Sequence, residues 1–171
     1  MKNLIILSTF MALFSFSGCA AQPKVDNAPI TTDFSLDRYL GQWYEIARFD
    51  HRFERGIQQS TAQYSLRPDG KVAVLNSGIK DGKPKDARGK AKLTDNPAIL
   101  RVSFFGPFYG DYRILLLDPD YRYVLVGGSS AKYLWILSRT PQLPEGAREL
   151  LLAEATRRGY DISQLIWVEQ R

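Results

Sequence analysis

The chain contains few residues of the types that build disulfides and metal sites: one cysteine, one histidine and two methionines in 171 residues. A single cysteine cannot form a disulfide within the chain. One histidine and one cysteine also supply too few nitrogen and sulfur ligands for zinc, so we expect no metal site. We also expect no cofactor. There is no G-x-S-x-G nucleophile motif. No lysine- and arginine-rich helix accompanies the net charge of +5, which argues against nucleic acid as a partner.

The sequence also lacks an apolar run long enough to span a bilayer. The longest largely apolar stretch, residues 4–16, follows Lys2 and precedes Ser17, Gly18 and Cys19. Its length is typical of the central region of a secretory signal peptide. The ending resembles that of a bacterial lipoprotein signal, in which the cysteine is acylated and becomes the first residue. The alternative is an ordinary secreted protein with a free cysteine.

These signals predict the organisation of the chain. We expect a signal peptide over residues 1–18, a lipidated Cys19 that begins a flexible tether over residues 19–32, and one folded domain over residues 33–171. Ala20 replaces the aspartate that marks retention in the inner membrane in many such lipoproteins. The expected location is therefore the outer membrane, where the anchored protein would face the periplasm.

The rest of the chain reads as a series of short strands with turn signals between them, among them Asp69-Gly70 and Asp81-Gly82. The predicted strands are residues 41–49, 58–66, 71–79, 85–93, 98–106, 110–118, 121–128 and 133–140. Eight antiparallel strands in hairpin order favour an all-β, up-and-down barrel, because closure removes unpaired edges. An open sandwich is the alternative. A barrel of this size either fills with side chains or holds one small ligand.

A helix follows the eighth strand. Pro144 stands at its start, Glu149 in its first turn and Arg157 in its last turn, and Gly159 is a C-terminal cap. The apolar stripe of this helix predicts that it packs outside the barrel. Residues 163–170 are a candidate ninth strand.

Three blocks of this sequence resemble those of the lipocalin family: Gly41-x-Trp43 at the first strand, "DPDYRYVLVGG" before the eighth, and "LWILSRTP" with Arg139. The sequence of these blocks is most similar to that of the bacterial outer-membrane lipoprotein subgroup, whose animal relative is apolipoprotein D. The resemblance implies a barrel floor in which Arg139 stacks on Trp43 and Gly41 permits close approach. These three residues would be structural and would not touch a ligand.

Strand alternation then gives candidate lumen-facing residues. Glu45, Ala47 and Phe49 share the side of Trp43, and Leu137 shares that of Arg139. The residues expected to contact a ligand are Tyr64, Ser103, Phe105, Tyr112, Ile114, Tyr123 and Trp135, with Val74 and Leu125 on the same walls. The alternative is a barrel filled by its own side chains.

The resemblance implies a fatty acid or a lysophospholipid as the ligand, bound for storage or transport. The basic segment 80–92, or Arg48 and Arg113, would attract a polar head or an anionic membrane, unless these charges are simply solvated. We expect no catalysis: His51 reads as a solvent-facing loop residue, and Glu45 is the remaining acid–base candidate. The other functions left open are a structural or stress-related envelope protein with an incidental cavity, and a lipid-processing enzyme. A homodimer is a further candidate assembly.

Overall fold

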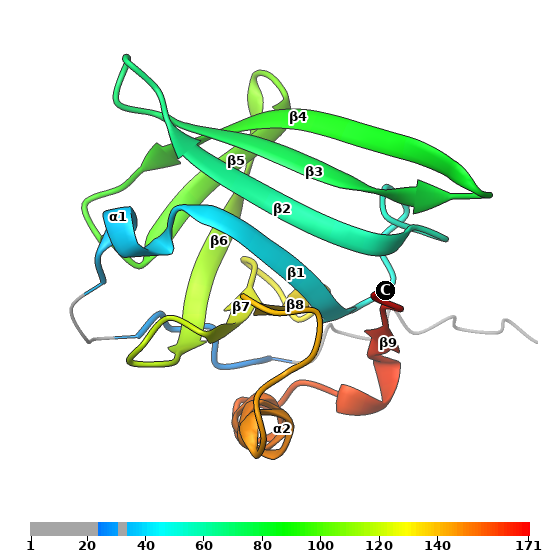
Figure 1. Ribbon diagram of the computed structural model, residues 1–171. Helices are drawn as coiled ribbons and strands as arrows, with labels where there is room; N and C mark the ends of the chain where they lie inside the picture. Colours follow the sequence, from blue (N-terminus) through cyan, green and yellow to red (C-terminus); the bar gives the residue numbers. More distant parts are fainter. Residues whose placement is uncertain (1–23, 31–33) are drawn as a thin grey trace, which may run out of the picture.

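The computed structural model describes residues 24–30 and 34–171, whose main body is a closed barrel of eight antiparallel strands (Figure 1). The strands are β1 (Gly41–Arg48), β2 (Gln58–Leu66), β3 (Val72–Lys80), β4 (Lys83–Leu93), β5 (Ile99–Phe105), β6 (Phe108–Leu117), β7 (Tyr123–Gly127) and β8 (Leu134–Ser138). Each pairs with the next, and β1 closes the sheet by pairing with both β2 and β8. The predicted barrel is confirmed, and the open sandwich is excluded.

Four short elements complete the fold. Helix α1 (Leu36–Tyr39) precedes β1, and helix α2 (Ala147–Arg157), the 3₁₀ turn η1 (Ile162–Gln164) and strand β9 (Ile166–Trp167) follow β8. Strand β9 pairs with the end of β1, so the predicted ninth strand is confirmed in shortened form. None of the helices within residues 24–30 and 34–171 has the length and hydropathy of a membrane-spanning helix.

Topology gives the barrel two different ends. The connections β1–β2, β3–β4, β5–β6 and β7–β8 lie at one end, which we call the mouth. The connections β2–β3, β4–β5 and β6–β7 lie at the other, which we call the closed end, where α1 leads into β1 (Figure 1). This division follows from sequential antiparallel pairing and positions everything described below.

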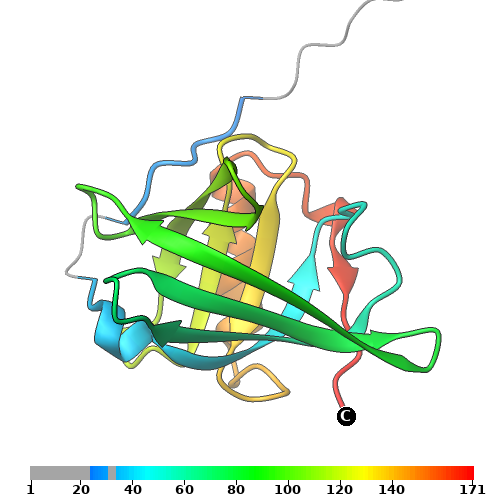
Figure 2. The ribbon, with the colours of Figure 1, turned by 90° about the horizontal axis from the view of Figure 1, so that it is seen from above.

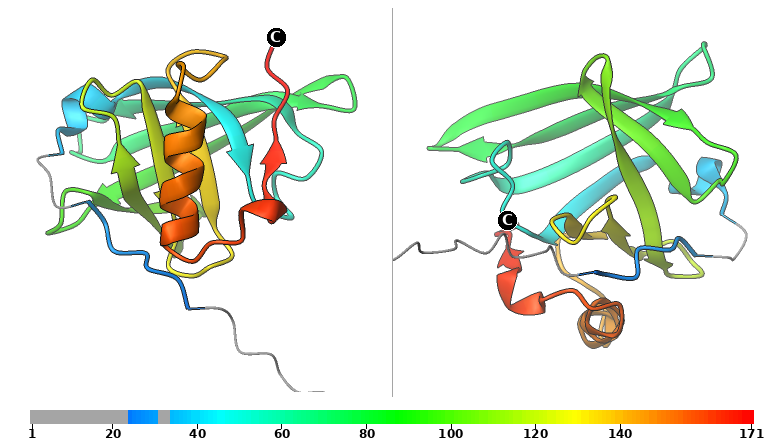
Figure 3. Two further views of the ribbon diagram at one scale, coloured as in Figure 1. Left: turned by 90° about the horizontal axis from the view of Figure 1, so that it is seen from below. Right: turned by 180° about the vertical axis from the view of Figure 1, so that it is seen from behind.

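Helix α2 lies against the outer face of the barrel at β7 (Figure 3, left). Its buried residues Leu151 and Ala155 join an outer cluster that includes Tyr123 and Leu125 of β7. The intervening Val124 and Val126 belong to the inner core. Strand β7 is therefore buried on both faces and carries an unbroken apolar run, which hides its alternation. The prediction that Tyr123 and Leu125 face the lumen is wrong for this reason.

Strand β1 changes its inward side part-way along. The pairing of β1 with β8 shifts register between Glu45 and Ala47, as a β-bulge does. Before the bulge, Trp43 is in the inner core. After it, Ala47 and Phe49 belong to the outer cluster. The prediction that Ala47 and Phe49 share the side of Trp43 is wrong, because the bulge adds one residue.

Residues 24–30, which we call the N-terminal strap, are bound to the outside of the barrel. The backbone N–H of Asp26 donates to the Arg158 carbonyl (2.9 Å), and that of Ile30 to the Ile114 carbonyl (2.8 Å). The Asn27 amide donates to the Gly128 carbonyl (3.1 Å). The prediction of a flexible tether over residues 19–32 is therefore wrong for residues 24–30. The predicted signal peptide and Cys19 lie outside the described residues.

Candidate ligand-binding site

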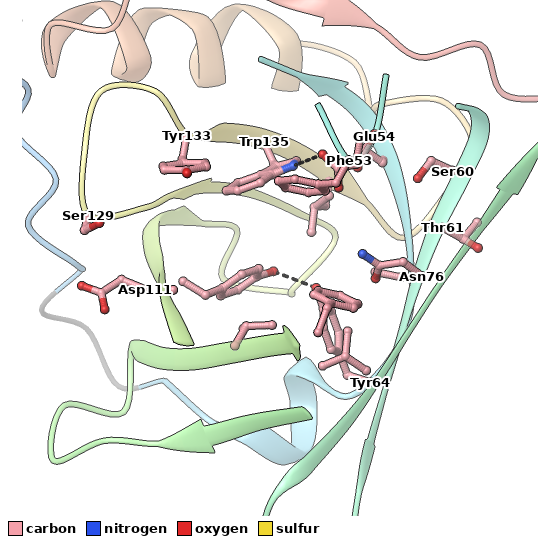
Figure 4. Close-up of a pocket in the computed structure, with 18 residues that line it drawn as sticks. Phe53, Glu54, Ser60, Thr61, Tyr64, Asn76, Asp111, Ser129, Tyr133 and Trp135 are labelled. Atoms are coloured by element: carbon pink, nitrogen blue, oxygen red, sulfur yellow. Dashed lines mark hydrogen bonds between the residues drawn. The ribbon is translucent and has the colours of Figure 1, made fainter. Parts of the chain in front are cut away.

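A cavity of about 300 Å³ occupies the barrel and extends from the mouth toward the closed end (Figure 4). Its walls are mainly apolar and aromatic, and come from six of the eight strands and from two mouth loops. The residues that form these walls include Ala62, Tyr64, Val74, Val102, Phe104, Tyr112, Tyr133, Trp135 and Leu137. This volume is at the lower end of the range for small-molecule sites, about 300–1,000 Å³.

Three tyrosines close the deep end of the cavity. The Tyr39 and Tyr112 hydroxyls lie 2.6 Å apart, and the Tyr64 hydroxyl donates to that of Tyr112 (3.1 Å, Figure 4). Burial raises the pKa of all three hydroxyls well above the usual value, so they are neutral. Because they bond to one another, this end of the cavity presents mainly ring surface, which suits an apolar tail.

Trp43 and Arg139 form a plug beneath the tyrosines. The Arg139 guanidinium lies 3.9 Å from the centroid of the Trp43 ring. Its N–H groups donate to the carbonyls of Gln42 (2.8 Å) and Tyr39 (3.1 Å). Gly41 has φ of 93°, and a Cβ there would lie 3.4 Å from Arg139 Nη1. The plug seals the closed end and contributes no surface to the cavity.

The mouth is partly covered by an aromatic stack. The His51 ring lies 4.7 Å from that of Trp135, 5.1 Å from that of Tyr133 and 5.3 Å from that of Phe53. Only 5% of His51 is exposed, so the prediction of a solvent-facing histidine is wrong. Burial lowers the pKa of His51 to about 4, which leaves it neutral near pH 7. The loop between β1 and β2 folds over the cavity, which strand patterns do not reveal.

Two carboxyl groups, those of Glu45 and Glu54, and the guanidinium of Arg48 are buried beside this stack. Arg48 pairs with Glu45 and donates to the backbone carbonyls of Glu54 and Ile57, both at 2.8 Å. Trp135 Nε1 donates to Glu54 Oε2 (3.1 Å). Burial, and then the charge of Glu45, raises the pKa of Glu54 to about 8, and burial also raises that of Glu45. Arg48 therefore holds the loop in place and is too deeply buried to receive a polar head, contrary to our expectation.

A family model described as "Lipocalin-like domain" matches residues 34–170. The chain belongs to the lipocalin family. It is 47% identical to the outer membrane lipoprotein Blc of Escherichia coli K12, over 99% of this chain and 98% of that one. Mouse apolipoprotein D is 34% identical, over 86% and 82% of the two chains. The solved structure of insecticyanin from Manduca sexta superposes with a TM-score of 0.70, covering 88% and 87%; at 21% identity this shows the fold alone.

Of the seven predicted ligand contacts of this lipocalin, three line the cavity and four do not, one of the four being Tyr123 in the outer cluster. Tyr64, Tyr112 and Trp135 line the cavity. Ile114 is fully buried in the inner core but does not reach the cavity wall. Ser103 and Phe105 lie on the other side of β5 from Val102 and Phe104, which do line the cavity, and Phe105 is 78% exposed.

The errors on β5 have a simple origin. The segment "ILRVSFF" carries apolar residues at both alternating sets of positions, so composition did not determine which set faces inward. The mouth-loop residues Phe53, Glu54, Ser129 and Tyr133 were missed for another reason. Alternation along strands carries no information about loops that fold over a barrel.

Proposed function

We propose that this lipocalin is an outer-membrane lipoprotein, anchored through an acylated Cys19 and facing the periplasm, that binds one fatty acid or lysophospholipid inside its barrel. The observation that carries this proposal is the cavity of about 300 Å³, apolar along its walls and closed beneath by the tyrosines and the plug. The location is supported by relatives named outer membrane lipoprotein, matched over nearly their whole length.

The size of the cavity suits one acyl chain. Burying about ten methylenes at roughly 0.8 kcal/mol each contributes about 8 kcal/mol before costs. Lost translational freedom and ordering of the chain offset part of this, so a micromolar dissociation constant is expected. A tail directed at Tyr64 and Tyr112 would leave its polar head at the mouth.

The mouth offers charges of both signs to such a head. Asp111, on the cavity wall, pairs with Arg113 (2.8 Å) and with Arg101 (3.2 Å). A zwitterionic phospholipid head could pair with this group through both its phosphate and its cation. A fatty acid offers only the carboxylate. We therefore expect lysophospholipid to bind more tightly than a fatty acid of the same chain length.

Replacing Trp135 tests the proposed site. In calorimetric titrations of residues 20–171 with lysophospholipid, Trp135→Ala should weaken binding at least tenfold, because the indole forms part of the cavity wall. The matched control is Trp167→Ala, since Trp167 lies outside the barrel on β9 and is half exposed. The affinity of the Trp167→Ala variant for lysophospholipid should match that of the unchanged protein.

Two outcomes would contradict the proposal. Equal weakening by both variants would mean that the ligand binds elsewhere. Absence of saturable binding at tens of micromolar for either lipid would favour a structural protein whose cavity is incidental. The lipocalin family membership and the pairing of Glu45 with Arg48 support the prediction that the chain is not an enzyme.

A further inference from the structure

The N-terminal strap runs along the barrel from the mouth toward the closed end (Figure 2). Near its start, Asn27 bonds to Gly128, directly after the mouth end of β7. Ile30 bonds to Ile114, further along β6. The described chain resumes at Phe34, whose ring lies 5.2 Å from that of Tyr39 at the closed end. Lys24 is therefore the residue of the strap on the mouth side.

Arg158 fixes the strap in this position. Its side chain is 7% exposed and donates to the carbonyls of Asp26 (3.1 Å) and Ala28 (2.7 Å). The same guanidinium donates to the Leu115 carbonyl (2.7 Å) and to Glu154 Oε1 (2.7 Å). One buried side chain thus joins strap, barrel and α2. Since Cys19 precedes Lys24 by only five residues, at most about 18 Å of chain separates them.

The mouth also carries the three most exposed large hydrophobic side chains of the described residues. Phe105 and Phe108 face each other across the β5–β6 turn and are 78% and 77% exposed. Phe53, on the β1–β2 loop, is 61% exposed. Single exposed hydrophobic residues are common, but a group of aromatic rings at one end of a barrel indicates a contact surface.

Basic side chains accompany these rings. Lys90 and Lys92 of β4 lie over the Tyr109 ring, next to the β5–β6 turn, at 6.0 and 4.6 Å from its centroid. Lys80 and Lys83 flank the β3–β4 turn, also at the mouth. Aromatic rings beside lysines are the combination with which proteins bind the interface of an anionic membrane.

We infer that the mouth of this lipocalin faces the membrane that holds its acyl anchor, with Phe105 and Phe108 in the lipid interface. The short reach from Cys19 to the mouth end of the strap brings this end of the barrel to the membrane, and the rings and lysines fit its surface. The cavity then opens directly onto the leaflet. The inference rests on the proposed acylation of Cys19 and adds the orientation of the barrel and the route of the ligand.

Site-specific labelling tests the orientation. The full chain, produced with its own signal sequence, is purified and inserted into vesicles of phosphatidylethanolamine and phosphatidylglycerol. Because an acylated Cys19 has no free thiol, Phe108→Cys introduces the thiol that a fluorophore labels. The matched control is Leu93→Cys, also an exposed apolar residue, at the closed end. Nitroxide-bearing lipids should quench the label at position 108 several-fold more than the label at position 93.

Intact mass separates the two possible failures. An acylated protein quenched equally at both positions, or more at position 93, would overturn the orientation alone. A mass without acyl chains would overturn the proposed anchor and with it the orientation.

Ligand transfer gives an independent readout. The double change Phe105→Ser and Phe108→Ser should slow uptake of a fluorescent lysophospholipid from these vesicles about tenfold. Affinity for the same lipid in solution should stay unchanged, because neither residue lines the cavity. The closed-end control, Leu66→Ser with Leu93→Ser, should leave both quantities unchanged. Equal uptake rates for the two double variants would contradict direct transfer at the mouth.

Discussion

Arg139→Ala should lower the free energy of unfolding by about 3 kcal/mol. The change removes the stacking on Trp43, worth roughly 0.5–2 kcal/mol, and several hydrogen bonds to backbone carbonyls at about 1 kcal/mol each. Arg139→Lys should recover little of this loss, since a lysine cannot stack and bond to several carbonyls at once. Urea unfolding followed by circular dichroism measures both variants.

The chain supplies a matched control for this prediction. Arg148 stacks on Trp167 at the same distance, 3.9 Å, but on the exposed outer surface. Arg148→Ala should cost less than about 1 kcal/mol, because an exposed pair of this kind contributes little. If the two alanine variants lose equal stability, the stacking alone would account for the effect, and the plug at the closed end would not be a specific structural element.

As the pH rises from 6.5 to 8, the unchanged protein should lose stability. The Glu54→Gln variant should not show this loss. The pKa of Glu54 is about 8 in the folded protein and near 4.3 in an unfolded chain. Between these values the folded protein holds a proton that the unfolded chain has released, so stability falls as pH increases. At about 1.4 kcal/mol per pH unit for one group, the loss over this interval is about 2 kcal/mol.

The chosen interval avoids the opposing effect of His51. Its pKa falls to about 4 on folding, so its contribution to stability increases with pH from about 4 and is complete near 6.5. Glutamine preserves the acceptor for Trp135 Nε1 and isolates the carboxyl group of Glu54. The surface change Glu149→Gln should follow the unchanged protein. Parallel pH profiles for Glu54→Gln and the unchanged protein would mean that Glu54 is ionised when folded.

The architecture was predictable because each strand carries its own local signal. Turn residues such as Asp81-Gly82 separate segments of alternating polarity, and the strand predicted at residues 58–66 matches β2 as observed. Gly159 has φ of 87° after α2, as its prediction as a cap requires. Closure of the barrel follows from the number of strands and their hairpin order. These features depend on residues close together in the chain.

The site was less predictable because it depends on features that alternation does not encode. One extra residue at the β1 bulge reverses the side of Ala47 and Phe49. Strand β7 is buried beneath α2 as well as against the inner core, so its apolar sequence does not indicate that Tyr123 faces outward. The β1–β2 loop places Phe53 and Glu54 in the cavity wall, and Arg48 holds the loop there by donating to the Glu54 backbone carbonyl. The strap is held by Arg158, more than a hundred residues away.

The central claim is that the barrel holds one lipid chain between Tyr112 and Trp135. Its most direct test is a crystal structure with a fatty acid that carries bromine at its terminal carbon, located by anomalous scattering. We expect one bromine per chain inside the barrel, near Tyr64 and Tyr112 at the deep end. Bromine bound only on the outer surface, or a barrel without ordered bromine at saturating ligand, would contradict the account.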